Sequence, residues 1–172
     1  DDAVMLFTQY STQWDGLGHV GQMFDIQGNG MPEKVYYNGF RGGSDIVGPD
    51  DAPEGWGANA IGIENMATAG VQGRGVMVDF ERVYGRERAL IGYDQLMRIM
   101  DEQKIEVLAG DFLCLYTGFA DLILEMNKKP DGEVLARSCA VLNGRDKRLL
   151  QWITDSNIVA ICADNFAVEA YP

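Results

Sequence analysis

Basic side chains are scarce in this sequence of 172 residues. There are 14 Lys and Arg against 26 Asp and Glu, which gives a formal net charge of −12. A chain this acidic is repelled by nucleic acid and by anionic membrane surfaces, and no basic patch compensates for that repulsion. We therefore expect neither a nucleic-acid nor a membrane partner.

Long hydrophobic runs are also missing. No apolar stretch approaches the roughly 20 residues that a bilayer-spanning helix needs, and the N-terminus lacks the basic-then-apolar pattern of a secretory signal. We expect a cytoplasmic protein. The sequence starts at Asp1 without a methionine and stops at Pro172 soon after a strand-like run. We expect native sequence to be lacking at both ends, and residues 1–172 alone to be poorly stable or inactive.

Cysteine is rare and shows no pairing pattern. Cys114, Cys139 and Cys162 are odd in number and widely spaced, so they match neither a disulfide framework nor a CxxC metal site. Free cysteines of this kind are most often buried. We expect all three thiols to be reduced and most of them to lie in the interior.

The composition that remains is that of one globular domain. Hydrophobic residues make up 47% of the chain, which is long enough for one sizeable core and too short for two. Residues 1–58 are rich in glycine and aromatic residues and favour loops with short strands. No linker, repeat or low-complexity tract divides the sequence, so we expect a single domain over 1–172.

From residue 59 onward, helical and strand patterns alternate. Apolar residues at helical spacing predict one helix over 63–69, a second that begins near Asp94 as its N-cap, and a third after Asn143 and Gly144. Each helix is followed or preceded by a strand-like run, at 75–80, 111–116 and 158–163. This order predicts an α/β domain whose strands are at least partly parallel.

Residues able to hold a cation gather in one short stretch, Gln9-x-x-x-Gln13-x-Asp15-x-x-x-His19. On an extended strand Gln13 and Asp15 point to the same face. The glycines at 16 and 18 allow the backbone to turn, so that His19 can reach that face. The spacing alone is also compatible with a local hydrogen-bonded turn without metal.

Three segments of the chain resemble the cyclase family of metal-dependent hydrolases, which includes arylformamidase (kynurenine formamidase) and isatin hydrolase. The family motif is H-x-x-x-H-x-D-x-x-x-H, and Asp15 and His19 match it outright, while 12–19 as a whole is similar to a variant branch. Residues 73–80 look like the family's "GRGVLLD" strand, and 110–119 like its "GDVVLIRTGW" strand. The resemblance implies a swivelling β/β/α fold, a mixed sheet flanked by helices, with the motif loop at the edge of the sheet.

The sequence departs from the family pattern at the ligands. Gln9 and Gln13 stand where the first two histidines usually are. Neutral amides in place of imidazoles weaken a zinc preference and favour harder cations that accept oxygen donors. By the resemblance we expect one divalent ion, Mn2+ or Zn2+ with Mg2+ as a further option, bound by Gln13, Asp15 and His19 and supported by Gln9. The family's later "D-x-x-S-x-D" segment corresponds to 164–169, where Ala167 and Glu169 replace the serine and the second aspartate.

The resemblance implies hydrolysis of an aryl or cyclic amide, a carbon-nitrogen bond other than a peptide bond, by a metal-activated water. His19 is the only histidine and the candidate catalytic base, ligand or both. An aromatic or cyclic amide would be bound by a wall of aromatic side chains: Trp14, Phe24, Tyr36, Tyr37 and Phe40. The alternative is that these side chains belong to the hydrophobic core. We expect a homodimer or homotetramer, with 14–43 as an interface. Hydrolysis of a lactone or carbamate, and a non-catalytic relative that has lost its ligands, remain open alternatives.

Overall fold

The computed structural model describes every residue except 1, 5, 7–8, 10–11, 53–54 and 171–172. The chain forms two compact units: one contains 1–13 and 73–172, and the other contains 14–72. Within the described residues, no helix is both long and apolar enough to cross a bilayer. The expectation of a single domain stays a prediction.

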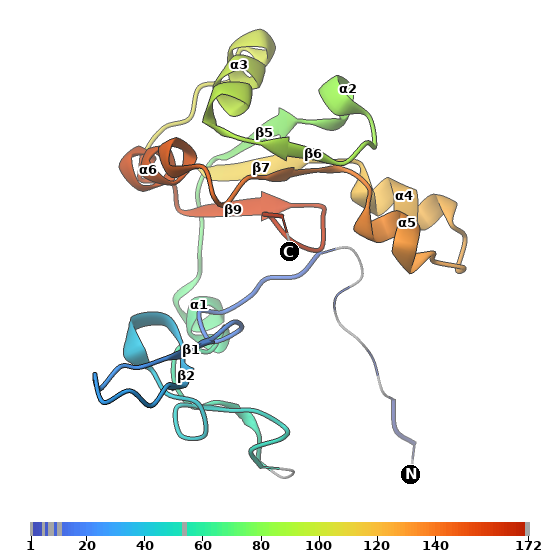
Figure 1. Ribbon diagram of the computed structural model, residues 1–172. Coiled ribbons are helices and arrows are strands. Elements are labelled where there is room, and N and C mark those ends of the chain that lie inside the picture. The colour runs from blue at the N-terminus through green and yellow to red at the C-terminus, as the bar shows by residue number, and fades with distance from the viewer. Residues whose placement is uncertain (1, 5, 7–8, 10–11, 53–54, 171–172) are drawn as a thin grey trace. The chain divides into compact units, whose positions relative to one another are not determined.

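The larger unit is built on a parallel three-stranded sheet, in the order β5-β7-β9 (Figure 1). Its strands are β5 (Gly75–Asp79), β7 (Phe112–Tyr116) and β9 (Ala160–Ala163). Two further parallel strands pair with each other, β6 (Ala89–Ile91) and β8 (Ala140–Leu142). The parallel arrangement confirms the prediction from the alternating helix and strand patterns.

Five helices belong to this unit: α2 (Glu81–Tyr84), α3 (Tyr93–Gln103), α4 (Phe119–Glu125), α5 (Gly132–Ala136) and α6 (Lys147–Ser156). Helix α3 packs against β5 and α6, and α4 packs against α5. In Figure 1, α4 and α5 lie beyond the carboxyl ends of the strands. The side chain of Asp146 caps α6 by accepting hydrogen bonds from the amides of Arg148 and Leu149.

Alternation along the strands divides their side chains between two faces. Val78 on β5 and Leu113 and Leu115 on β7 face the core, where all three are buried. The helices and the second strand pair contribute the remaining buried members of this core: Phe80, Ile91, Leu96, Ile99, Met100, Ala140, Leu142 and Leu149. Met77, between two core-facing valines, is 62% exposed on the opposite face. The predicted apolar stripes of the helices at 93–103 and 147–156 are thus confirmed.

The outer edge of β5 meets a side chain from α3 instead of a further strand. Gln103 Oε1 accepts a hydrogen bond from the Asp79 amide at 2.9 Å, and Gln103 Nε2 donates to the Asp79 carbonyl at 2.7 Å. The same residue of β5 is in register with Tyr116 of β7 on the inner side. Gln103, the last residue of α3, therefore completes the hydrogen bonding of the strand end.

An ion pair between a half-exposed arginine and a buried carboxylate fixes the start of β7. The Arg74 guanidinium donates to both oxygens of Asp111, at 2.9 and 2.7 Å, and the Leu108 amide donates to Asp111 as well. Asp111 is only 3% exposed. These contacts hold the pKa of Asp111 at about 2, with the Arg74 hydrogen bonds as the largest cause.

The described residues of the smaller unit form short antiparallel strand pairs, a 3-10 helix and an α-helix. Strand β1 (Gln22–Phe24) pairs with β2 (Glu33–Val35), and β3 (Ile46–Val47) pairs with β4 (Gly57–Ala58). A short 3-10 helix, η1 (Tyr37–Gly39), follows β2, and α1 (Glu64–Ala69) ends at Gly70. These elements match the loops and short strands expected for 1–58 and the helix expected over 63–69.

One detail of the sequence analysis was wrong. The N-cap of α3 is Gly92, and Asp94 lies in the first turn of the helix. The carboxylate of Asp146 accepts the hydrogen bond of the Tyr93 amide at 2.8 Å. A side chain 53 residues away thus supplies the cap that a local pattern had assigned to Asp94.

Candidate functional site

The motif loop turns sharply between Asp15 and His19. The His19 amide donates a hydrogen bond to the Gly16 carbonyl at 3.0 Å, which closes a turn over residues 16–19. Gly16 lies so close to the loop before α1 that a Cβ on it would stand 2.9 Å from the Ile63 nitrogen. Glycine is therefore required for the close approach that sets this turn.

The turn brings together the two residues that match the family motif. His19 Nδ1 lies 3.6 Å from Asp15 Oδ1, and the side chains are 53% and 44% exposed. Both groups belong to the smaller unit, so the pair is held by local structure. His19 Nε2 is the ring nitrogen directed away from this contact, because Nδ1 takes part in it.

The spacing of the pair suits a shared cation. Two donors that each lie about 2.1 Å from one ion, at a tetrahedral angle, stand roughly 3.4 Å apart. The 3.6 Å between His19 Nδ1 and Asp15 Oδ1 is close to this value. Among the described residues, no three His, Cys, Asp or Glu side chains gather closely enough to hold a metal ion. Asp15 and His19 therefore supply two ligands, and the remaining ligands of a metal ion would come from other groups.

The two glutamines of the motif belong to the other unit. The division between the units falls between Gln13 and Trp14. Gln13 is half-buried and follows an extended segment without assigned secondary structure. Gln9 is exposed, and its Nε2 donates to the Phe166 carbonyl at 3.2 Å. This hydrogen bond connects Gln9 to the loop after β9. Gln9 therefore has a structural contact in addition to the supporting role at the metal that the sequence predicts.

Two of the aromatic residues expected to bind substrate line separate hollows. Trp14 lines a hollow of about 320 Å³ against one side of α1, together with Ile63 and Met66. Tyr36 lines a different hollow of about 230 Å³, beside Gly21. Trp14 is the neighbour of Asp15 in the sequence, so the first hollow is the nearer of the two along the chain to the Asp15 and His19 pair.

Strain is stored in the loop that supports the turn. Ile61 has a φ of +51°, which is rare for a β-branched residue. Its carbonyl lies 3.2 Å from the position a Gly16 Cβ would take. Ile61 and Gly16 also line a hollow of about 390 Å³ with Leu17 and Asn65. Backbone strain of this type costs on the order of 1–3 kcal/mol and often clusters at ligand sites.

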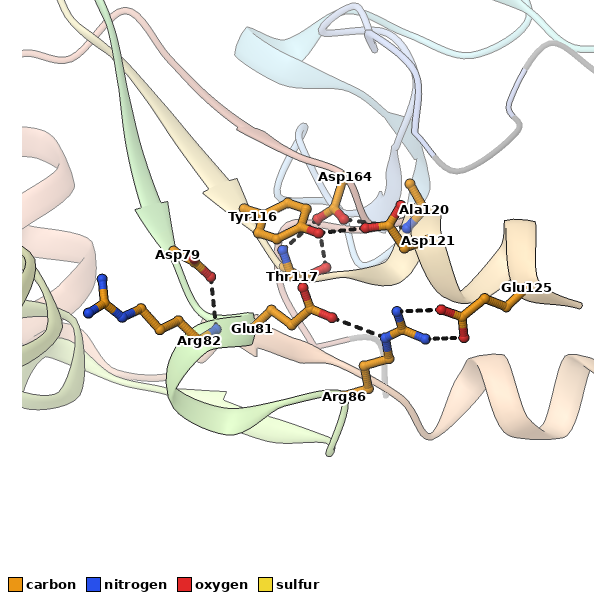
Figure 2. Close-up of polar contacts among 10 residues, drawn as sticks. All are labelled: Asp79, Glu81, Arg82, Arg86, Tyr116, Thr117, Ala120, Asp121, Glu125 and Asp164. Atoms are coloured by element: carbon orange, nitrogen blue, oxygen red, sulfur yellow. Dashed lines mark hydrogen bonds and ion pairs between the residues drawn. The ribbon is translucent and has the colours of Figure 1, made fainter.

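A second polar cluster lies at the carboxyl ends of β5, β7 and β9 (Figure 2). Asp164, at the end of β9, accepts hydrogen bonds from the Thr117 amide and from the Thr117 hydroxyl, both at 2.7 Å. Its other oxygen faces the Ala120 amide at 3.4 Å. Asp164, which the sequence aligned with the first aspartate of the family's later segment, thus caps the start of α4.

Ion pairs and hydrogen bonds within the cluster engage its remaining acidic groups. Arg86 donates a hydrogen bond to Glu81 at 3.1 Å and forms a bidentate ion pair with Glu125. The Tyr116 hydroxyl donates to Asp121, and the hydrogen bonds to Asp121 and Glu81 raise the pKa of the Tyr116 phenol. Figure 2 shows these side chains directed toward one another. The arrangement suits a structural brace at the strand ends.

This cluster was not predicted from the sequence as functional or structural. A signal was available, since Asp79, Tyr116 and Asp164 lie at or next to the end of a predicted strand, and the carboxyl ends of parallel strands meet at one edge of a sheet. The pairing of Arg86 with Glu125 had no such signal, because 39 residues separate them.

Comparison with known proteins gives one family. The sequence model of the cyclase family matches residues 2–170. No curated protein matches the chain. A crystal structure described as that of a novel cyclase is similar to this chain, with 26% sequence identity and a TM-score of 0.68. The match covers 92% of this chain and 46% of that cyclase, so the sequence spans about half the length of its structural relative. Because the family match includes nearly every residue, the chain belongs to the cyclase family.

Proposed function

We propose that this chain forms part of a metal-dependent hydrolase that acts on an aryl or cyclic amide. The observation that carries the proposal is the Asp15 and His19 pair, held 3.6 Å apart by the turn at Gly16. A carboxylate and an imidazole at this separation are ligand types that divalent ions bind in proteins. The expected ion is Mn2+ or Zn2+, with Mg2+ as a further option.

The proposed roles follow from the charge and geometry of the pair. Asp15 would hold the cation, since its carboxylate is the only formal negative charge among the proposed ligands Gln13, Asp15 and His19. A bound divalent ion would lower the pKa of a water molecule and polarise the scissile carbonyl. His19 would coordinate the ion or accept the proton of the attacking water. If His19 acts as the base, Nε2 is the atom that takes the proton, because Nδ1 faces Asp15.

The substrate class is inferred from the family resemblance and from the apolar hollow beside Trp14. That hollow, of about 320 Å³, is lined by Trp14 together with aliphatic side chains of α1 and the segment after it. An aromatic ring could be buried there while its carbonyl approaches Asp15. Lactones and carbamates share the same attack on a carbonyl, so they are the competing substrates in the test.

The substitutions at Gln9 and Gln13 favour a second candidate, a relative that has kept the fold without catalysis. Loss of imidazole ligands removes the strongest nitrogen donors of the motif. Metal analysis separates the two candidates. A catalytic protein would contain or respond to a divalent ion, whereas a non-catalytic relative would show neither metal nor turnover.

Metal affinity tests the site directly. We expect Asp15→Asn to weaken binding by more than the roughly 10- to 100-fold that loss of a supporting group costs. Gln13→Asn and Gln9→Ala should have smaller effects, because neutral amides contribute only dipoles. Affinity for Mn2+ and Zn2+ would be measured by titration calorimetry on metal-free protein. Asp50→Asn, which changes an exposed carboxylate outside the motif, is the matched control.

His19→Ala should abolish turnover on a panel of aryl formamides, cyclic amides, lactones and carbamates. Lost metal in this variant would identify His19 as a ligand, and retained metal would identify it as the base. The proposal is wrong if the purified protein neither contains nor responds to manganese, zinc or magnesium, and if chelation leaves its activity intact.

A further inference from the structure

Three sulfur-bearing side chains stand in one row across the parallel sheet of the larger unit. Met77 of β5 is in register with Cys114 of β7, and Cys114 is in register with Cys162 of β9. Register partners on neighbouring strands project from the same face of a sheet. This face is the one opposite the core formed by Val78 and Leu115.

The three sulfur side chains line one hollow. It has a volume of about 150 Å³, and its wall also includes Tyr116 and Asp164 at the strand ends. Met77 is 62% exposed, while Cys114 and Cys162 are half-buried. The carboxylate of Asp164 is already engaged by the amide and hydroxyl of Thr117. Sulfur is therefore the donor that this hollow offers.

The two cysteines are close neighbours that remain unbridged. Both are free thiols. Cys114 Sγ lies 3.8 Å from the Phe112 carbonyl, and the Cys114 and Cys162 thiols interact with each other. Burial raises the pKa of the Cys162 thiol, and the adjacent Cys114 thiol raises it further. Binding of a cation through thiolate ligands would displace the thiol protons.

The spacing of the strands is compatible with a bridging ion. Paired residues on neighbouring strands lie about 4.8 Å apart. Two thiolates about 2.3 Å from a shared metal ion stand roughly 4.0 to 4.6 Å apart, depending on the angle at the ion. The same strand spacing lies within the range of Cα separations that a disulfide spans, so oxidation to a disulfide is the competing fate of the pair.

From these observations we propose that Met77, Cys114 and Cys162 form a binding site for a soft monovalent cation, copper(I). Thiolate and thioether ligands select such ions over harder divalent ions. On binding, two S–H bonds are broken, two sulfur-copper bonds form, and two protons pass to solvent. The Met77 thioether supplies a third, neutral ligand. This site is separate in sequence and chemistry from the Asp15 and His19 pair.

The test uses reduced, metal-free protein titrated with copper(I) under anaerobic conditions against a chromophoric copper(I) chelator. We expect one ion per chain. Cys114→Ser and Cys162→Ser should each lower the affinity by at least about 100-fold, and Met77→Leu by about 10-fold, as loss of thiolate and thioether ligands requires. X-ray absorption should show sulfur neighbours only.

Matched controls are available for both side-chain types. Cys139 is a fully buried thiol outside the row, and Met23 on β1 is 63% exposed, nearly the same as Met77. Cys139→Ala and Met23→Leu should leave the affinity unchanged. In wild-type protein, copper(I) should protect Cys114 and Cys162 from alkylation without changing the labelling of Cys139, a readout that requires no variant.

Two results would overturn the proposal. The first is copper(I) binding that survives both cysteine substitutions, or that the control substitutions weaken equally. The second is absence of copper(I) binding to the reduced wild-type protein, whether or not Cys114 and Cys162 form a disulfide in air, which is seen as a loss of two mass units from the linked peptides.

Discussion

Gly16 shows how a single missing side chain can position a site. A Cβ at this position would stand 2.9 Å from the Ile63 nitrogen and 3.2 Å from the Ile61 carbonyl, both of them backbone atoms. The backbone on one side would have to move, and His19 is hydrogen-bonded to Gly16 through the same turn. The absence of a side chain at residue 16 therefore sets the distance between Asp15 and His19.

We expect Gly16→Ala to lower the free energy of unfolding by about 1–3 kcal/mol, the usual cost of overpacking, and to weaken divalent metal binding. Urea denaturation and metal titration would measure the two effects. Gly132→Ala is the control, because nothing lies within 4 Å of its added Cβ. Unchanged metal affinity in Gly16→Ala would show that the turn does not set the ligand geometry.

Asp111 should make stability depend on pH in the acid range. Its pKa is about 2 in the folded protein, below the ordinary value of 3.8, chiefly because Arg74 donates two hydrogen bonds to it. A lowered carboxyl pKa stabilises the folded state above the ordinary value, and this stabilisation is lost as the pH falls from about 4 to about 2. Asp111→Asn lacks an ionisable group, so it should lose less stability across this window.

Urea midpoints at pH 7, 4 and 2.5 would measure this dependence. Arg74→Gln keeps the Asp111 carboxylate but removes its main hydrogen-bond donor. The loss of stability of this variant between pH 4 and pH 2.5 should therefore lie between those of wild type and Asp111→Asn. Equal shifts of the midpoint in all three proteins would rule out Asp111 as a source of the acid sensitivity.

At the residue scale, the sequence predicted contacts that are local. Asp15 and His19 are four residues apart, and the intervening glycines predicted the turn that brings them together. Arg74 and Asp111 are 37 residues apart, and no sequence period connects them. Their pairing depends on β5 and β7 becoming neighbours, which is a property of the assembled sheet.

At the scale of whole elements, α4 depends on a side chain from another strand. Asp164 at the end of β9 accepts two hydrogen bonds from Thr117, which is 1% exposed, just before α4 begins. Removal of this carboxylate leaves buried donors unsatisfied, at a cost of about 1–3 kcal/mol. We expect Asp164→Ala to lower the free energy of unfolding by that amount and to speed hydrogen exchange in 117–125.

Asp155→Ala is the comparison for this prediction, since Asp155 is an exposed residue on α6. Exposed substitutions of this kind usually change stability by less than about 0.5 kcal/mol. If both variants unfold at the same denaturant concentration, the contacts of Asp164 do not stabilise α4.

The elements that the sequence predicted are those with a clear period or a long apolar run. Strands β5, β7 and β9 and helices α3 and α6 each place regularly spaced residues in the core or against it, such as Leu96 and Ile99 of α3. Strands β6 and β8 have three residues each, too few for an alternating pattern to be recognised. Helices α4 and α5 were not predicted, and only Phe119 of the two is buried.

At the scale of the whole molecule, exposed apolar side chains gather in the sequence of the smaller unit. These side chains are each more than half exposed: Trp14, Leu17, Val20, Met23, Phe24 and Tyr37. Clusters of this kind often mark association surfaces. We expect a homodimer or homotetramer that assembles through 14–43.

Sedimentation velocity at micromolar concentration would test this expectation. Val20→Lys, at a side chain that is 74% exposed, should shift the population toward monomer, while Val134→Lys on α5, which is 44% exposed, should not. Wild-type protein that sediments only as a monomer would contradict the prediction.

Gln103 limits how two molecules of this protein can associate through the edge of β5. Its amide offers the same donor and acceptor as a peptide group, and it takes up both outward-facing backbone groups of Asp79. An incoming chain that tried to extend the sheet at this end of β5 would find no open backbone groups on Asp79. Gln103 is the last residue of α3. The backbone groups of Asp79 therefore become available for pairing only when the end of this helix lifts from the sheet. Fraying of the last turn of α3 is therefore the step that would open the Asp79 end of β5 to pairing with another chain.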